Sequence, residues 1–290
     1  MTDEAINLIN SHDIDTPYFL HMSHYAVHTP IQAKRKDIKR FRKKAKTMRL
    51  NKKKTFSLDE HFPCKGKKLF RVRRRLVQSN ARYAAMIFNL DYNIGRLLDA
   101  IEESGQADNT VIVFTSDNGG LATAEGSPTC NAPLAEGKGW MYEGGVREPL
   151  IIKWTGKVKA GSECSTPVTS PDFYPTILDM ANLPLIPEQH SDGESIVPLL
   201  KNDGELKREA IYWHYPHYAN QGSTPGSSIR MGDYKLIEFF EDNRIELYNL
   251  REDLSEENDL SKVNPELAQN MRKKLSEWRN NVGALIPILK

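Results

Sequence analysis

Residues 110–120 read TVIVFTSDNGG, a continuous β-branched run followed at once by a polar, glycine-rich turn. An apolar run without alternation is typical of a strand that is buried on both faces of a parallel sheet. Residues 150–154, LIIKW, form a second run of this kind, and helical patterns flank both segments. Strands and helices that alternate at this spacing predict an α/β fold with a mainly parallel sheet.

The strongest helical pattern lies in residues 79–105, where apolar side chains recur at three- and four-residue steps. Ser79 or Asn80 is suited to cap this helix, and Gly105 is suited to its left-handed end. A shorter helix is predicted for residues 170–180, where proline is tolerated in the first turn.

The pattern changes after about residue 200. Three strand-like segments and an amphipathic helix follow, at residues 210–215, 228–240, 244–250 and 265–281. We therefore predict two units, residues 1–203 and residues 204–290. The second is a small α+β subdomain with an antiparallel sheet.

The composition describes a globular chain of 290 residues, with 39% hydrophobic and 27% charged residues. The apolar runs are far shorter than the roughly 20 residues that a membrane-spanning helix needs. The three cysteines have no C-x-x-C spacing, so neither a disulfide framework nor a thiolate zinc site is predicted. No apolar segment follows Met1, so we expect no secretory signal peptide in this sequence.

The formal net charge of +2 conceals a basic insert at residues 34–75, which contains 20 of the 40 Lys and Arg residues. Such a charge run predicts a largely irregular, exposed insertion. It could also attract a polyanion, either nucleic acid or a sulfated glycan, by counterion release. No recognisable nucleic-acid-binding fold surrounds it, so nucleic acid is not the expected partner.

Asp117 and Asn118 follow the predicted strand at its carboxyl end, where α/β proteins place ligands. Their oxygens suit calcium or magnesium, although Asp-Asn-Gly-Gly is equally common in ordinary turns. Lys138 stands between two glycines, which would let it approach an anion closely, and His28 precedes Thr29-Pro30. In one pocket, a divalent cation, a lysine and a histidine would neutralise an oxyanion and its leaving oxygen.

This ordered set closely resembles the type I sulfatase family of the alkaline phosphatase superfamily. The motifs that carry the resemblance are HTP at 28–30, YAAMI at 83–87, TSDNGG at 115–120, and GKG with YEGGVREP between 137 and 149. DGES at 192–195 also resembles the family's signal near the end of its main domain. The resemblance implies an alkaline-phosphatase-like sandwich and the hydrolysis of sulfuric esters of aryl or carbohydrate compounds.

The resemblance also implies roles for individual residues. Asp117 and Asn118 match the ligands of one calcium ion. Lys138 matches the lysine that holds a sulfate oxygen and the ester oxygen, and His28 matches the histidine that contacts the sulfate and assists the leaving group. His217, in an aromatic segment, is a further candidate for substrate binding, because histidines and aromatic faces suit sugars.

One part of the family pattern is missing from these 290 residues. The family's nucleophile is a hydrated formylglycine made from the first residue of a C/S-x-P-x-R motif, and neither this motif nor the family's Asp-Asp metal pair occurs here. We therefore expect the chain to correspond to the C-terminal portion of a sulfatase, with residues 1–203 as part of the catalytic domain. We expect it to be inactive alone, with an N-terminal fragment as a candidate partner.

Two alternatives remain open from the sequence. One is a phosphate or phosphonate ester hydrolase of the same superfamily, although such enzymes usually use two transition metals and more His and Asp ligands than this sequence offers. The other is a non-catalytic polyanion-binding protein that acts through residues 34–75. The cellular compartment is also open, since family members are usually exported.

Overall fold

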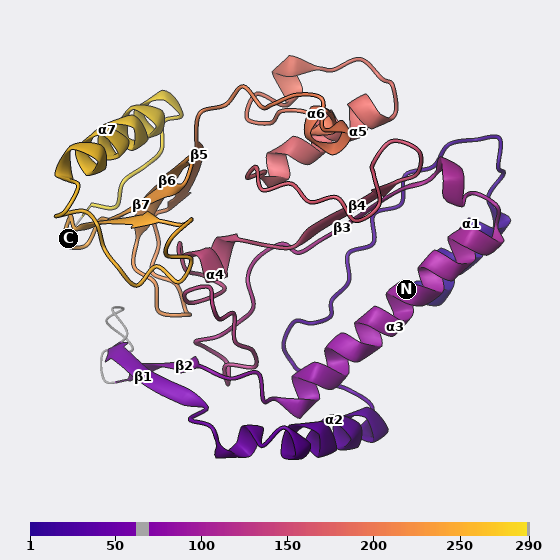
Figure 1. The fold of residues 1–290 in the computed structure, drawn as a ribbon, viewed down its shortest axis with the longest axis horizontal. Helices are drawn as coiled ribbons and strands as arrows, with labels where there is room; N and C mark the ends of the chain where they lie inside the picture. The colour runs from indigo at the N-terminus through magenta and orange to yellow at the C-terminus, as the bar shows by residue number, and fades with distance from the viewer. Residues whose placement is uncertain (62–69, 289–290) are drawn as a thin grey trace.

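The computed structural model describes residues 1–61 and 70–288, and Figure 1 shows how its elements are arranged. Cys64 lies outside the described residues. Within them, the strands form two antiparallel pairs and one four-stranded antiparallel sheet. The strands are β1 (Phe56–His61), β2 (Arg71–Arg75), β3 (Val111–Thr115), β4 (Leu150–Trp154), β5 (Ile211–Tyr215), β6 (Gly226–Met231), β7 (Tyr234–Phe239) and β8 (Ile245–Asn249).

The helices are α1 (Thr2–Ser11), α2 (Arg35–Thr47), α3 (Ala81–Glu103), α4 (Glu143–Val146), α5 (Phe173–Met180), α6 (Val197–Lys201) and α7 (Pro265–Asn281). In Figure 1, α7 lies beside the C-terminal sheet, α5 and α6 lie above the β3–β4 pair, α4 lies near one end of that pair, and α1, α2 and α3 lie below and to the right of it. Short 3₁₀ turns occur at η1 (Leu50–Lys52), η3 (Ala107–Asn109), η4 (Ser170–Asp172) and η5 (Pro187–Gln189). In the described part of the chain, no helix combines the length and apolar character needed to cross a bilayer.

Helix α3 forms where its sequence pattern predicts it. The Asn80 side chain accepts hydrogen bonds from the backbone N–H groups of Arg82 and Tyr83, which satisfies two of the free donors at the helix start. Gly105 follows the helix with a positive φ of 74°, as the predicted left-handed end requires. The predicted start and end of this helix are both confirmed.

The direction of β3 differs from the prediction. β3 pairs with β4 in antiparallel register, with Val111 opposite Trp154 and Thr115 opposite Leu150. The segment between the two strands folds into loops and the short helix α4, so β4 returns alongside β3. A continuous apolar run indicates a strand but does not determine its direction, so the parallel pairing predicted for residues 110–115 was wrong.

The β3–β4 pair is also more exposed than an apolar run predicts. Val113, Phe114 and Ile151 are 42%, 37% and 62% exposed, respectively. Burial on both faces would need a covering layer on each side of the pair. Among the described residues such a layer is incomplete, and apolar side chains of both strands face solvent.

The C-terminal subdomain has the predicted antiparallel sheet with α7 packed on one face. Strands β5 to β8 are neighbours in chain order. The fully buried core between sheet and helix consists of Ile229, Leu236, Leu247, Ala268, Met271 and Leu275. The single strand predicted at residues 228–240 is instead a hairpin of β6 and β7, in which Gly232 takes a positive φ of 54°. The boundary near residue 203 stays a prediction.

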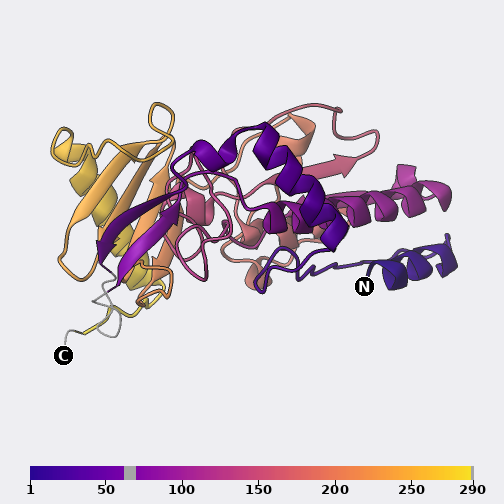
Figure 2. The same cartoon turned by 90° about the horizontal axis from the view of Figure 1, so that it is seen from below.

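In its described residues, 34–61 and 70–75, the basic insert is ordered, contrary to the prediction of a largely irregular segment. It forms α2 and the β1–β2 hairpin, and α2 packs along α3 through Phe41, whose ring lies 5.9 Å from that of Phe88 (Figures 1 and 2). Lys, Arg and Ala are good helix formers. Ile38, Phe41 and Ala45 give α2 one narrow, half-buried apolar side on an otherwise exposed, basic helix.

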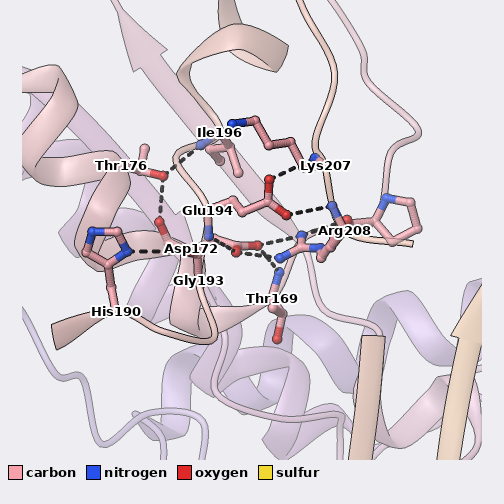
Figure 3. A network of polar contacts seen from close by, with 10 residues as sticks. Thr169, Asp172, Thr176, His190, Gly193, Glu194, Ile196, Lys207 and Arg208 are labelled. Carbon is pink, nitrogen blue, oxygen red and sulfur yellow. Dashed lines mark hydrogen bonds and ion pairs between the residues drawn. The ribbon is translucent and has the colours of Figure 1, made fainter. Parts of the chain in front are cut away.

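The buried carboxylate of Asp172, just before α5, holds the chain segment that leads into β5 of the C-terminal subdomain, as Figure 3 shows. Asp172 is fully buried and accepts hydrogen bonds from Arg208 at 2.5 and 2.7 Å, and from the backbone N–H groups of Thr169 and Glu194. Glu194, in the DGES motif, accepts in turn from the backbone N–H groups of Lys207 and Arg208 at 2.8 Å. The chain that enters β5 is thereby fixed to α5 by bidentate ion pairing.

Replacing Asp172 with alanine should lower the free energy of unfolding by about 3–5 kcal/mol, because Arg208 would remain buried without its partner. The matched control is Asp242→Ala, since the Asp242–Arg244 pair is 52% and 45% exposed and such pairs contribute at most about 1 kcal/mol. Urea unfolding followed by circular dichroism measures both variants. Equal losses for the two would contradict the stabilising role of the buried pair.

Candidate functional site

Asp117 and Asn118 lie side by side in the loop that follows β3. The Asn118 side-chain amide donates a hydrogen bond to the Asp117 carboxylate, and the Ser116 hydroxyl donates to the backbone carbonyl of Asn118. One carboxylate oxygen and one amide oxygen remain outside these bonds. The two predicted calcium ligands are therefore neighbours, and their metal-binding role stays a prediction.

The loop that holds these residues packs directly on the loop that holds Lys138. The N–H of Gly119 donates to the carbonyl of Gly145 at 3.1 Å, and the N–H of Lys138 donates to the carbonyl of Gly120 at 3.2 Å. A Cβ atom at Gly119 would lie 1.8 Å from the carbonyl oxygen of Gly144. Only glycine allows this approach, and the approach places the backbone of Lys138 beside the Asp117–Asn118 loop.

Gly119→Ala tests this packing directly. Its methyl group would collide with backbone, so the two loops would have to separate, and we expect stability to fall by about 1–3 kcal/mol. The matched control is Gly95→Ala in α3, where a Cβ meets nothing within 4 Å. That control should raise stability by about 0.5–1 kcal/mol, because alanine favours a helix interior.

Thermal or urea unfolding of both glycine variants measures the difference. A Gly119→Ala variant as stable as the parent chain would show that the loops can move apart freely, which contradicts the close backbone packing described above.

Glu148 is a member of the site to which the sequence analysis gave no role. Burial, together with the negative charge of Asp117, raises the pKa of Glu148 to about 7, while the nearby Ser116 side chain acts in the opposite direction. Its Oε1 atom is buried and, among the described residues, has no hydrogen-bond partner. A carboxylate oxygen held this way beside Asp117 is suited to a cation. The sequence feature that could have pointed to Glu148 was its place in the motif YEGGVREP.

The oxygen donors present are chemically suited to calcium but do not complete a binding site. Asp117, Asn118 and Glu148 provide hard oxygen ligands, whereas Ca²⁺ takes six to eight. Within residues 1–61 and 70–288, no group of three or more His, Cys, Asp or Glu residues could hold a metal ion. The described residues therefore supply part of a coordination shell.

His28 lies in a loop that is joined to the segment after Gly120. Its ring N–H at Nδ1 donates to the carbonyl oxygen of Thr29 at 2.8 Å, which leaves Nε2 for another partner. The Thr29 hydroxyl donates to the Glu125 carboxylate at 2.7 Å. The His28 loop is thus tied through Thr29 to Glu125, in the segment after Gly120, and the role of His28 toward sulfate stays a prediction.

His217 is placed apart from the other candidates. It is exposed in the loop after β5, and its ring lies 5.4 Å from that of Tyr215. In the described part of the chain, no hydrogen bond or ring contact joins it to His28, Asp117 or Lys138. The same loop does reach the site through Gln221, which packs against Gly139.

Comparison with protein families identifies the family to which these motif-bearing loops belong. The family model described as Sulfatase matches residues 1–183, and the model of the C-terminal region of N-sulphoglucosamine sulphohydrolase matches residues 136–281. The chain belongs to the sulfatase family. The resemblance predicted from the sequence motifs is therefore confirmed.

Individual sulfatases and solved structures resemble the chain over most of its length. A sulfatase of Formosa agariphila is 35% identical over 92% of this chain, which spans 47% of that protein. The N-acetylglucosamine-6-O-sulfatase of Bacteroides thetaiotaomicron is 36% identical over 69% of the chain, which spans 36% of that protein. The chain thus spans about half the length, or less, of these curated relatives.

Among solved structures, Ps i-CgsB aligns with a TM-score of 0.73 at 30% identity over 96% of this chain and 53% of its own. BT4656, solved with its substrate D-glucosamine-2-N,6-O-disulfate, aligns with a TM-score of 0.58 at 33% identity, over 69% of this chain and 40% of its own. Together with the family model, these neighbours confirm the predicted alkaline-phosphatase-like fold class.

The sulfatase motif around Glu143 also anchors the C-terminal sheet. The Lys235 ammonium is fully buried and lies 2.9 Å from Glu143 and 3.0 Å from Glu256. The Glu256 carboxylate accepts the backbone N–H of Glu143 at 2.6 Å, and burial raises its pKa to about 7 although Lys235 opposes the shift. The sheet therefore holds α4 in place five residues after Lys138.

Lys235→Met should destabilise the chain by about 3–5 kcal/mol, because it leaves the buried Glu256 carboxylate without its cation and leaves Glu143 with only the more distant Arg230 and Arg147. Lys274→Met is the matched control, since the Lys274–Glu209 pair is 36% and 79% exposed and should contribute at most about 1 kcal/mol. Urea unfolding compares the two variants. A Lys235→Met variant no less stable than the control would show that the buried cluster does not hold the sheet to α4.

Proposed function

We propose that this chain forms the C-terminal part of a sulfuric ester hydrolase. The observation that carries the proposal is the close backbone packing between the loop of Asp117 and Asn118 and the loop of Lys138, in a chain that belongs to the sulfatase family. This packing gathers a lysine and oxygen donors for a cation within two adjoining loops. Such a set neutralises a sulfate ester as negative charge develops on its leaving oxygen.

Each candidate residue has a distinct proposed task. The Lys138 ammonium holds a sulfate oxygen and the ester oxygen, and His28 contacts the sulfate and assists the leaving group. The hydrogen bond from His28 Nδ1 to Thr29 supports this task, because it fixes the ring and leaves Nε2 for the substrate. Asp117 and Asn118 ligate calcium once further oxygen donors complete the shell.

The proposed substrate class is a sulfated carbohydrate. One relative is by name an N-acetylglucosamine-6-O-sulfatase, and BT4656 was solved with a sulfated glucosamine. Aryl and steryl sulfatases are also similar to the chain, over shorter stretches of 51% and 46%. His217 is proposed as a more distant sugar contact, supported by its exposure beside Tyr215.

The chain alone is proposed to be inactive toward sulfate esters. Its 290 residues contain no C/S-x-P-x-R motif, and a water molecule held by Lys138 and His28 would lack a covalent route. We further propose that a segment that carries the nucleophile packs against β3 and β4. The exposed apolar side chains of Val113, Phe114 and Ile151 support this pairing.

An assay with an aryl sulfate and calcium tests both parts of the proposal. The purified chain alone should not hydrolyse the aryl sulfate, whereas co-expression with an N-terminal sulfatase segment from directly upstream in the genome should give activity. Lys138→Ala should then lower kcat by roughly 10²–10³-fold, as loss of an oxyanion-stabilising group does. Lys157→Ala, an exposed lysine in the turn after β4, is the control and should change kcat less than twofold.

Turnover by the chain alone, abolished by Lys138→Ala, would contradict the proposed inactivity. Activity after co-expression that Lys138→Ala leaves unchanged would contradict the proposed site.

A further inference from the structure

A cavity of about 370 Å³ lies between β2, the turn at residues 123–127 and the loop after β5. Arg71 and Arg73 of β2 line one side of it, residues 123–127 line another, and Asn220 contributes from the loop after β5. Its walls thus come from the basic insert, from the segment after Gly120 and from the C-terminal subdomain.

Hydrogen bonds from β2 fix the position of the cavity wall at residues 123–127. The Arg75 side chain donates to the carbonyl oxygen of Ser127 at 2.5 Å, and the Ser127 hydroxyl donates to the carbonyl oxygen of Arg73 at 2.8 Å. Glu125 and Ser127 adopt positive φ angles of 50° and 47°, which are unfavourable for residues with side chains. The hydrogen bonds from β2 hold this turn in place, so the insert is part of the wall.

The cavity carries positive charge from two guanidinium groups. Arg71 and Arg73 are two positions apart on β2 and therefore point to the same side of the strand. The Arg73 guanidinium stacks on the Phe56 ring at 3.5 Å, which holds its plane while the N–H groups stay free to donate at the edge. Among the described residues, no acceptor forms a hydrogen bond with it.

Glu125 is the acidic group of the cavity, and its oxygens are already engaged. They accept hydrogen bonds from the Thr29 hydroxyl at 2.7 Å and from the Asn220 amide at 3.4 Å. Glu125 therefore joins the His28 loop to the loop after β5.

The cavity also shares a wall with the Lys138 loop. The Trp140 indole N–H donates to the hydroxyl of Thr123, a lining residue, at 3.1 Å. Gln221, next to Asn220, packs against Gly139. Lining residues Thr123 and Glu125 are thus hydrogen-bonded to Trp140 and Thr29, which lie two positions from Lys138 and one from His28.

We propose that this cavity binds a second anionic group, a sulfate or a carboxylate, on the sugar next to the one whose sulfate ester is cleaved. The inference rests on the proposed function for its first anchor point, the sulfate at Lys138 and His28. A planar guanidinium with a fixed plane donates two parallel hydrogen bonds to such an anion, which gives geometric selectivity as well as attraction. The substrate is then an oligosaccharide with charge on adjacent units.

Isothermal titration calorimetry on the 290-residue chain tests this cavity without requiring turnover. The probes are a disaccharide with a sulfate on each sugar, its singly sulfated counterpart, and a counterpart with a carboxylate in place of the second sulfate. Arg73→Gln should weaken binding of the two doubly charged probes about tenfold or more, since it removes a hydrogen-bonded charge pair. Binding of the singly sulfated probe should stay within twofold.

Arg42→Gln, on the exposed side of α2, is the matched control, and it should change binding of every probe less than twofold. Arg73→Lys, which keeps the charge but loses the planar fork, should fall between the parent and Arg73→Gln, and it serves in its place if Arg73→Gln misfolds by circular dichroism. Equal effects of Arg42→Gln and Arg73→Gln would overturn the proposal in favour of general attraction by the insert. Absence of measurable binding of the doubly charged probes would also overturn it.

The two proposals fail separately. If binding depends on Arg73 but no ester hydrolysis follows co-expression, the proposed function is contradicted and the anion-binding cavity is supported. Aryl sulfate hydrolysis with binding that does not depend on Arg73 would remove the cavity alone.

Discussion

The contact between Gly119 and Gly144 determines how the rest of the site can be built. With room for no Cβ atom between them, two loops from different parts of the chain exchange backbone hydrogen bonds directly. Backbone groups that are satisfied by other backbone groups need no side chain or water, so the loops pack rigidly. The position of Lys138 relative to Asp117 then follows from main-chain geometry.

Buried ion pairs extend this rigidity to the C-terminal sheet. Glu143 begins α4 within the same glycine-rich loop and is held by Lys235 and Glu256. The ion pair of Asp172 and Arg208 likewise fixes the segment that leads into β5. Charges buried this deeply cost desolvation and are retained where they select one arrangement over others. Glu143 and Asp172 thus join the glycine-rich loop and α5 to the C-terminal sheet.

The sequence was informative where local rules govern structure. The Asn80 cap, the periodicity of α3 and the strand-like character of residues 210–250 all depend on residues within a few positions of one another. The glycines beside Asp117 and Lys138 were visible in the sequence, and the structure shows that a Cβ atom at Gly119 would collide with the Gly144 carbonyl. The direction of β3 was not predictable, since an apolar run records neither strand direction nor burial.

Contacts between distant residues escaped prediction for a different reason. Thr29 is hydrogen-bonded to Glu125, 96 positions away, and Asp172 to Arg208, 36 positions away. No local sequence pattern predicts either contact. Helix α2 was missed because its apolar side is only three residues wide among many charges. Glu148 was visible within a motif, but its closeness to Asp117 emerges only when β4 returns beside β3.

The outward-facing charge of α2 has a kinetic consequence. All eight of its lysines and arginines are exposed, and its apolar side is covered by α3. Their field reaches into the solvent over about 8 Å at physiological ionic strength. An anionic polymer that diffuses past is drawn to this side of the molecule before any contact forms, so its encounter rate rises in dilute buffer and falls as salt is added.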